Sequence, residues 1–288
     1  MPYEFRKVYL DLVTAEDEVC MLYLSFVRFF ARWHAYASLE IYDARGRRTV
    51  IHSKTAPPLI DPSRGLDQLP VALNIPGGKL ELEVRTIHDA WEPSAPSPVP
   101  ELEWSIGALR CHTDIVLNTD QGTRKLSGEG YLDFVRMTKA TRKLGLRSLR
   151  WGRVHLFERS LAFTALDLQD DRRWYVGVTR LHGRPARSYG SLSFDLKDGA
   201  GTVCYGSGGQ MLRLCKPTLL HQGSPFDAER VPKLFDRTVC STVSGPMHEQ
   251  RWRAEASVEA SHGKGTALHE LVWFGSQARQ AAKGKLAG

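Results

Sequence analysis

The segment GEGYLDFVRMTKATRKLGLRSLRWGRVH, residues 128–155, contains two strand-like stretches joined by a basic, polar connection. Read with the two-residue period of a strand, Tyr131 and Asp133 share one face of the first stretch. The same period places Trp151, Arg153 and His155 on one face of the second stretch. An acid beside aromatic rings, an arginine and an imidazole can form the wall of a reactive pocket or a buried ion pair. The residues alone leave both interpretations open.

Similar strand patterns continue on both sides of this segment. Residues 7–13 alternate, and residues 79–87, KLELEVRTI, place leucines and a valine on one side and charged residues on the other. Val19–Phe30, VCMLYLSFVRFF, is apolar on both faces, which is typical of a central strand. A helix is the competing interpretation there, but the β-branched and aromatic content favours a strand. Hairpin turns are predicted at residues 43–47, 169–172, 198–199 and 261–265.

Three segments are predicted to be irregular because turn-forming residues are frequent in them. They are residues 57–76, 91–100 and 216–233. Helix signals are almost absent, apart from good helix formers after Ser276. The chain is therefore predicted to be antiparallel and all-β, built of barrels or sandwiches. At about eight strands per small barrel, it should form two β-barrel domains packed side by side, residues 1–140 and 141–288.

The composition is that of a globular protein with a mildly basic surface. The 288 residues are 42% hydrophobic and 25% charged, so the chain can bury a full core. Lysine and arginine number 39 against 32 acidic residues, and this excess is spread along the chain. A nucleic-acid binder more often shows a basic stripe interleaved with exposed aromatics, or a recognisable module, and the sequence has neither. We therefore predict no nucleic-acid partner.

Cysteine usage and hydropathy indicate a reducing compartment. The five cysteines are scattered and form no C-x-x-C pair, so they are predicted to be free thiols rather than disulfides or zinc ligands. No signal-peptide pattern opens the sequence, and no apolar run approaches about 18 residues. We therefore expect a soluble, cytoplasmic protein, for which a loose peripheral association with a membrane stays open. The oligomeric state is not predicted.

Two H-E-x-x segments suggest metal binding at first sight. They begin at His248 and His269, but each continues to a tryptophan, Trp252 or Trp273, where a zinc protease motif requires a second histidine. Both segments also lie on predicted strands rather than on a helix. We therefore predict no metal site.

The motifs Gly128–Phe134 (GEGYLDF) and Trp151–His155 (WGRVH) resemble a known pair of markers. The pair, G-x-G-Y-H-D-H followed by W-G-R-x-H, belongs to a two-domain, lipocalin-like family. That family contains the carotenoid 1,2-hydratases (hydroxyneurosporene synthases) and, more distantly, fungal decalin-forming Diels–Alderase-type cyclases. The opening strand is also similar, with Tyr9 and Asp11 following Glu4. The resemblance implies two lipocalin-like barrels and an enzyme that needs no cofactor.

The sequence departs from the family marker on both sides of its acid. Leu132 and Phe134 replace the two histidines that flank the family's aspartate. Hydration of a double bond needs a proton donor in a dry cavity, and Asp133 suits that role if burial raises its pKa. The rings of Tyr131 and Trp151 suit the stabilisation of a developing carbocation. Since the polar partners that would position water are missing, cyclisation, isomerisation or simple binding also stay open.

We therefore expect a cofactor-independent, acid-assisted hydratase, cyclase or isomerase. Its substrate would be a hydrophobic polyene, isoprenoid or polyketide-like molecule, held in a pocket between or within the barrels. The candidate catalytic residues are Asp133 and Tyr131, and the candidate substrate-binding residues are Trp151, Arg153, His155, Asp11, Tyr9, Trp33 and His34. The alternative is a non-catalytic, lipocalin-like carrier for an apolar small molecule.

Each candidate also has a structural interpretation. Asp133 could form an ion pair with Arg153 or Arg136 rather than act as an acid. Arg153 could equally bridge to Asp11, which needs a partner on a mostly apolar strand. His155 could be a core histidine whose hydrogen bonds are satisfied.

Overall fold

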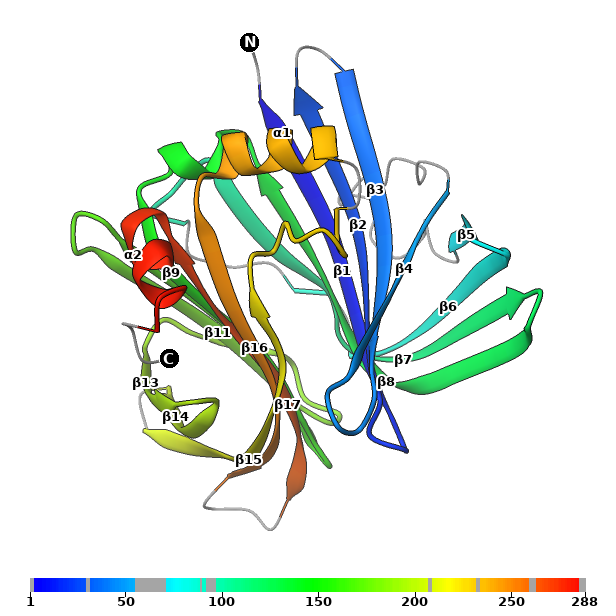
Figure 1. Ribbon diagram of the computed structural model, residues 1–288. Coiled ribbons are helices and arrows are strands. Elements are labelled where there is room, and N and C mark those ends of the chain that lie inside the picture. The colour runs from blue at the N-terminus through cyan, green and yellow to red at the C-terminus, as the bar shows by residue number, and fades with distance from the viewer. Residues whose placement is uncertain are drawn as a thin grey trace. The chain divides into compact units, whose positions relative to one another are not determined.

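The computed structural model describes residues 3–29, 32–54, 71–88, 90–91, 97–206, 209–231, 234–258 and 263–284. The chain divides into two compact units. Unit 1 comprises Met1–Glu92 and Pro100–Lys139, and unit 2 comprises Pro93–Val99 and Ala140–Gly288. Each unit is built around one antiparallel, barrel-like sheet (Figure 1), which confirms the predicted all-β class.

Unit 1 contains an eight-stranded sheet in the order β4-β3-β2-β1-β8-β7-β6-β5. Its strands are β1 (Glu4–Thr14), β2 (Val19–Phe29), β3 (Arg32–Tyr42), β4 (Arg48–His52), β5 (Val71–Ile75), β6 (Gly78–His88), β7 (Leu102–Thr119) and β8 (Gly122–Met137). Just after β4, the backbone N–H of Lys54 donates to the carbonyl of Asn74 on β5 at 2.7 Å. Because β4 and β5 are the two edges of the sheet, this bond brings the edges together.

Strand alternation separates an apolar face of this sheet from a second, more polar face. On β1, Val8, Leu10 and Leu12 all point into a buried apolar cluster, since every second side chain lies on the same face. The neighbouring strands add Leu22, Leu24, Phe26, Leu39, Ile41, Leu73, Leu80, Leu82, Ile115, Leu117, Leu132 and Phe134. Residues between these positions, such as Tyr9 and Asp133, lie on the opposite face, and they too are buried. That opposite face carries the candidate site.

Unit 2 contains a nine-stranded sheet in the order β12-β11-β10-β9-β17-β16-β15-β14-β13. Its strands are β9 (Leu146–Leu156), β10 (Arg159–Leu168), β11 (Arg173–Leu181), β12 (Arg187–Tyr189), β13 (Leu192–Lys197), β14 (Ala200–Tyr205), β15 (Gln210–Gly223), β16 (Met247–Val258) and β17 (Lys264–Phe274). The helices of its described residues are the 3₁₀ turn η2 (Thr141–Lys143), α1 (Leu234–Ser244) and α2 (Gly275–Ala281). Helix α2, red in Figure 1, packs Ala278 and Ala281 against a buried cluster of Trp252, Leu271 and Trp273.

The two H-E-x-x-W segments pair with each other across the β16–β17 hairpin. The register sets Trp252 opposite His269, and His248 opposite Trp273. The first pair stacks with ring centroids 5.2 Å apart, and the second pair lies 5.9 Å apart. Burial lowers the pKa of His269 to about 4, and its Nε2 lies 3.1 Å from the carbonyl oxygen of Gly199. These two histidines therefore pack with tryptophans.

Two of the irregular segments predicted from the sequence contain strands. Strand β15 runs through Lys216 and continues to Gly223, with register shifts between Cys215 and Thr218 and again before His221. Lys216 adopts a φ of 47°, so the strand tolerates this stretch by bulging rather than by ending. In the segment 57–76, residues 71–75 form β5, and residues 57–70 lie outside the described part. Helix α1 was not predicted at all.

None of the five cysteines, all of which lie in the described part of the chain, forms a disulfide bond. Among the described residues, no helix is long and apolar enough to cross a membrane.

Candidate active site

Asp133 lies near the middle of the buried second face of the unit 1 sheet. The antiparallel register of β1 and β8 places Tyr9 directly opposite Asp133, and Asp11 directly opposite Tyr131. On the other side of β1, Tyr23 of β2 is opposite Tyr9. Directly opposite residues on one face have Cβ atoms about 5 Å apart, so these side chains form one contiguous group.

One oxygen of the Asp133 carboxyl group is held by two hydrogen bonds. Trp104 Nε1 donates to Asp133 Oδ2 at 3.0 Å, and the Tyr131 hydroxyl donates to the same oxygen at 3.2 Å. The other oxygen, Oδ1, is buried and has no hydrogen-bond partner among the described residues. When the carboxyl group is neutral, its proton therefore belongs on Oδ1, since Oδ2 already accepts two hydrogen bonds.

Burial raises the pKa of Asp133 to about 6. The ammonium of Lys7 and the two hydrogen bonds to Oδ2 oppose this shift because they favour the carboxylate, whereas the charge of Asp11 adds to it. The desolvation effect is the largest, in keeping with an exposed fraction of 2%. A carboxyl group with this pKa can hold and release a proton near neutral pH.

Aromatic rings and a lysine extend the group along β1 and β2. The ring of Tyr9 lies 5.3 Å from that of Tyr23 and 6.5 Å from that of Tyr131. Lys7 Nζ lies 5.5 Å from the Tyr9 ring and 6.0 Å from the Tyr23 ring. The ammonium is thus held by ring faces, within electrostatic reach of Asp133.

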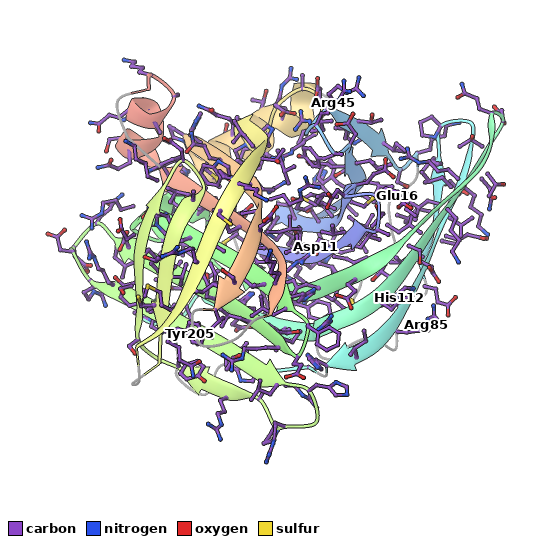
Figure 2. All side chains as sticks on the ribbon, turned by 90° about the horizontal axis from the view of Figure 1, so that it is seen from below. Asp11, Glu16, Arg45, Arg85, His112 and Tyr205 are labelled. Carbon is purple, nitrogen blue, oxygen red and sulfur yellow. The ribbon has the colours of Figure 1, made fainter. Side chains whose placement is uncertain are left out.

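Two further carboxylates are buried on the same face. Asp11, labelled on β1 in Figure 2, has no exposed surface, and neither has Glu40 on β3. Met21 of β2 is opposite both of them, which places the three side chains in one row across the sheet. The Tyr42 hydroxyl donates to Glu40 Oε2 at 2.5 Å. The face thus combines acids and phenols with apolar side chains such as Met21.

The glycines of the first marker motif are required by close strand packing. A Cβ atom on Gly130 would lie 2.0 Å from the backbone oxygen of Asp11, and one on Gly128 would lie 2.1 Å from that of Val13. Real Cβ atoms do not approach backbone oxygens this closely, so strand β1 would have to move. The motif therefore sets the distance between β1 and β8, and with it the position of Tyr9 relative to Asp133.

We expect the variant Gly130→Ala to lose about 3 kcal/mol of stability, because a side chain there displaces the backbone of a neighbouring strand. Gly190→Ala is the control, since a Cβ atom added there would have no atom within 4 Å and the backbone is not left-handed. Urea denaturation monitored by tryptophan fluorescence measures both variants. Equal midpoints for the two variants would contradict the prediction.

The second marker motif lies in unit 2, on β9. Trp151, Arg153 and His155 are buried and lie on the face opposite to Val154 and Leu156, which point into the apolar cluster of that unit. Arg153 Nη1 is 3.4 Å from His155 Nδ1. The three side chains share one face, as the strand period predicts. A pairing of Arg153 with Asp133 or Asp11 would join the two units and stays a prediction.

Arg136, the other suggested partner of Asp133, contacts different carboxylates. It lies on the apolar side of β8, and its Nε donates to Glu4 at 3.1 Å while its Nη1 donates to Glu103 at 3.2 Å. Arg6 and Arg28 also pair with Glu4. The hypothesis of an Asp133–Arg136 ion pair is therefore wrong. Successive side chains of a strand point to opposite faces, so two residues that are three positions apart do not share a face.

Trp33 and His34 are not part of the group around Asp133. Trp33 is 37% exposed and packs against the guanidinium groups of Arg6 and Arg28, at 5.4 and 5.6 Å. His34 is opposite Val27 on β2, four residues along that strand from Tyr23. The structure thus brings together Tyr9, Asp11, Tyr131 and Asp133. Trp33 and His34 lie instead at the end of the strands.

Sequence reasoning did not find Trp104, Lys7 or Tyr23. Trp104 lies on β7, which pairs with β8 through register shifts between Ile106 and Ala108 and again before Cys111. Those shifts, which alternation does not reveal, decide which β7 side chains reach Asp133. Lys7 could have been predicted from the sequence, because it lies two residues before Tyr9 and four before Asp11 and therefore shares their face of the strand. Within the described residues, no group of three or more His, Cys, Asp or Glu side chains could hold a metal ion.

No protein-family model and no curated protein sequence matches this chain. Its fold is nevertheless similar to that of solved structures over nearly the whole length. A Nitrosomonas europaea protein provisionally named AttH is 11% identical, with a TM-score of 0.62 over 96% of this chain and 93% of that protein. CghA with Sch210972 is 11% identical, with a TM-score of 0.57 over 94% of this chain and 88% of CghA. Kievitone hydratase from Nectria haematococca is 8% identical, with a TM-score of 0.53 over 94% and 88% of the two chains.

At these identities the similarity concerns the fold. The two-barrel architecture implied by the sequence resemblance is confirmed. What each of those proteins acts on is a property of that protein.

Proposed function

We propose that this chain is an enzyme that transfers a proton from Asp133 to an unsaturated, hydrophobic small molecule. The substrate class is a polyene, an isoprenoid or a polyketide-like compound, and the reaction is a hydration, a cyclisation or an isomerisation that needs no cofactor. The observation that carries the proposal is the state of Asp133. It is a buried carboxyl group with a pKa of about 6 whose Oδ1 has no partner among the described residues.

The hydrogen bonds of Asp133 suit a proton donor. Oδ1 would release its proton to a double bond, while Trp104 and Tyr131 continue to donate to Oδ2 and stabilise the carboxylate that forms. The carboxylate could then accept a proton from the added water or from the product's carbon skeleton. Proton loss at that step restores the acid, so the cycle closes without a further reagent.

The surroundings favour a short-lived charge on the substrate. The rings of Tyr9 and Tyr131 could stabilise a developing cation through their faces. The ammonium of Lys7 on the same face carries a like charge, and it disfavours a free carbocation. We therefore expect proton transfer and bond formation to overlap in time.

Similarity of fold supports this proposal without naming the substrate. Kievitone hydratase, as its name states, is a hydratase, and it shares the architecture of this chain. The second candidate function is a carrier for an apolar molecule, for which the lipocalin-like barrels would suffice. A cytoplasmic location stays a prediction.

The two candidates differ in what happens to a bound molecule. Native mass spectrometry of the purified protein, before and after extraction with organic solvent, identifies apolar compounds that bind. Incubating the protein with those compounds in heavy water then tests proton transfer. Deuterium on a carbon atom, or added deuterated water, is the expected result. Binding without any such change would support the carrier, and absence of binding would contradict both functions.

The variant Trp104→Phe tests the hydrogen bond to Oδ2. Phenylalanine cannot donate this hydrogen bond, which favours the carboxylate, so the pKa of Asp133 should rise further above its ordinary value. The fall in turnover that follows loss of this proton should then occur at a pH about one unit higher. The pH profile of turnover measures it, and Trp91→Phe, which alters the neighbouring ring 5.8 Å away, is the control. If turnover of Trp104→Phe falls at the same pH as that of the wild type, another group controls this pH dependence.

A further inference from the structure

Three chain segments meet at one end of the unit 2 sheet. Phe157 and Glu158 form the turn between β9 and β10, and Leu181 ends β11 directly opposite Arg159. The backbone N–H of His182 donates to the carbonyl of Glu158 at 2.8 Å, which ties the β11 end to that turn. Gly265 is opposite Leu156, so the start of β17 also reaches this place. We call this set, Phe157, Glu158, Arg159, Leu181, His182 and Lys264, the rim.

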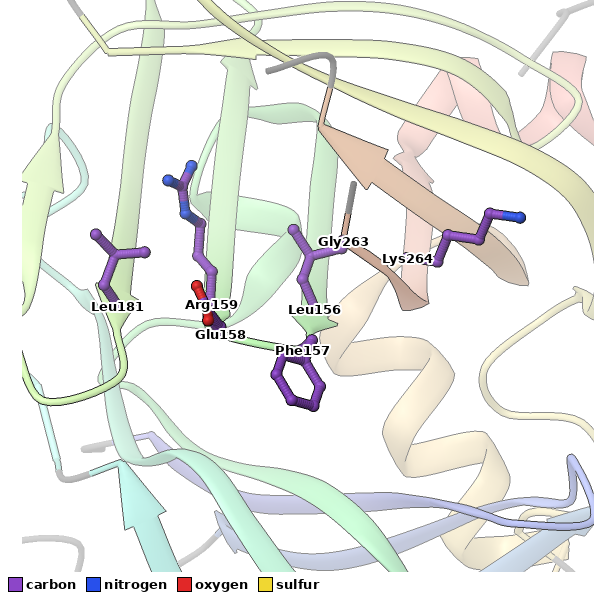
Figure 3. Close-up of a pocket in the computed structure, with 7 residues that line it drawn as sticks. All are labelled: Leu156, Phe157, Glu158, Arg159, Leu181, Gly263 and Lys264. Atoms are coloured by element: carbon purple, nitrogen blue, oxygen red, sulfur yellow. The ribbon is translucent and has the colours of Figure 1, made fainter. Parts of the chain in front are cut away.

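The rim exposes large apolar side chains. Phe157 is 83% exposed and Leu181 is 40% exposed. Most large apolar side chains of the described residues are buried, so exposure of a phenylalanine at a turn is costly unless something covers it. A cavity of about 410 Å³ lies among Leu156, Phe157, Glu158, Arg159, Leu181, Gly263 and Lys264 (Figure 3). None of its lining residues belongs to the unit that carries Asp133.

Cationic residues lie next to these apolar residues. Lys264 is exposed on the β17 side, and Arg159 is held in place by hydrogen bonds from its Nη1 to Tyr205 and Gln210. The segment 179–190, TRLHGRPARSYG, adds three arginines and a histidine and contains no acidic residue. Glu158 is the acidic residue among those that define the rim. Exposed apolar side chains beside cationic residues match the chemistry of an anionic lipid surface, which offers headgroup charges above a hydrocarbon layer.

We propose that the rim of unit 2 docks on the surface of an anionic lipid bilayer. Phe157 and Leu181 enter the boundary between headgroups and acyl chains, while Lys264, Arg159 and the arginines of the segment 179–190 contact the headgroup anions. The inference goes beyond the proposed reaction and does not depend on it. A docked enzyme would stand beside the layer in which apolar substrates dissolve.

Co-sedimentation with vesicles tests this proposal on the full-length protein. Vesicles of phosphatidylcholine with about 30% phosphatidylserine are compared with vesicles of phosphatidylcholine alone, at physiological ionic strength. We expect the wild type to bind the anionic vesicles about tenfold or more tightly than the neutral ones, because several cations act together. Phe157→Ala should weaken binding to anionic vesicles about tenfold, since an aromatic side chain no longer enters the interface.

Matched variants separate the rim from general surface effects. Lys264→Glu should weaken binding about tenfold. Lys197→Glu makes the same change of charge on an exposed residue at the far end of β13, where Lys197 is opposite Ala200, and it should bind nearly as the wild type does. Leu219→Ala removes an apolar side chain that is 45% exposed outside the rim, and it is the control for Phe157→Ala.

The outcomes are distinct. Weak binding of Phe157→Ala and Lys264→Glu together with normal binding of both controls would support the rim. If the wild type ignores anionic vesicles, or if all four variants bind alike, the proposal is overturned. Binding of a water-soluble fatty anion such as decanoate without vesicle binding would also overturn it, and it would assign the cavity to a small molecule. Circular dichroism checks that each variant is folded.

Discussion

The Asp133→Asn variant should lose turnover by about a hundredfold to ten-thousandfold, the usual effect of removing a positioned general acid. Asparagine keeps the shape of the side chain, and its oxygen can still accept from Trp104 and Tyr131. Ligand affinity should therefore change little. The measurement pairs turnover with a binding assay for the same compound. Unchanged turnover would reject Asp133 as the acid.

The pH dependence of wild-type turnover also tests whether Asp133 is the acid. The acid must be protonated, so turnover should be highest below pH 6 and fall as pH rises through the pKa of Asp133, about 6. The control is Asp114→Asn on the neighbouring strand β7. A hydrogen bond from Ser127 lowers the pKa of Asp114, so this group holds no proton near neutral pH and its removal should leave the profile unchanged.

Stability should also respond to Asp133. Its pKa is raised from 3.8 to about 6 in the folded chain, so the fold favours the neutral form. This contribution is fully present below the unfolded-state pKa and is lost as pH rises through about 6, which amounts to about 3 kcal/mol. Asp133→Asn cannot ionise and should be at least as stable as the wild type at pH 8. If the variant unfolds instead, Asp133 is a structural ion-pair residue.

The second large effect is expected from Glu249→Gln in unit 2. Glu249 is 4% exposed, and it accepts hydrogen bonds from Arg230 and from Arg251, the latter at 3.3 Å. His221 Nε2 lies 3.6 Å from the same oxygen. Removing the charge takes a carboxylate away from two buried guanidinium groups, of which Arg251 keeps its ion pair with Glu270 at 2.8 Å. We expect a loss of about 3 kcal/mol. Urea denaturation at pH 7 measures it.

Glu255→Gln on the same strand is the matched control. Glu255 pairs with Lys216 at 2.8 Å, but both side chains are exposed, so solvent screens the interaction and the midpoint should barely move. Burial raises the pKa of Glu249, but Arg230 and Arg251 lower it by more, so the net pKa is depressed. Its stabilisation is therefore present above the unfolded-state pKa and lost as pH falls through the folded one. Similar midpoints for the two variants would contradict the prediction.

Part of the candidate site followed from local pattern. Tyr131 and Asp133 share a face because the strand period is a property of consecutive residues, and Tyr9 and Asp11 share a face for the same reason. Whether Asp133 is buried was left open by the sequence, and in the structure it is 2% exposed and accepts a hydrogen bond from Tyr131. Its pairing with Arg136 was wrong, although the same alternation already placed the two side chains on opposite faces.

Residues that come from other strands could not be assigned in this way. Trp104 donates to Asp133 only because two irregularities between β7 and β8 shift the register near Ile106. Strand β15 was missed for a related reason. Lys216 and Pro217 look like a break, yet β15 continues because its partner β16 supplies hydrogen bonds on both sides of the bulge.

The sequence by itself determined the all-β class and the two faces of each strand, because alternation of apolar and polar residues is local and needs no knowledge of partners. Only the tertiary structure decided which strands are neighbours, and therefore that Tyr9, Trp104 and Tyr131 surround Asp133. It also decided the protonation of that carboxyl group. A pKa depends on desolvation and on charges from distant parts of the chain, and these exist only when the sheet has formed.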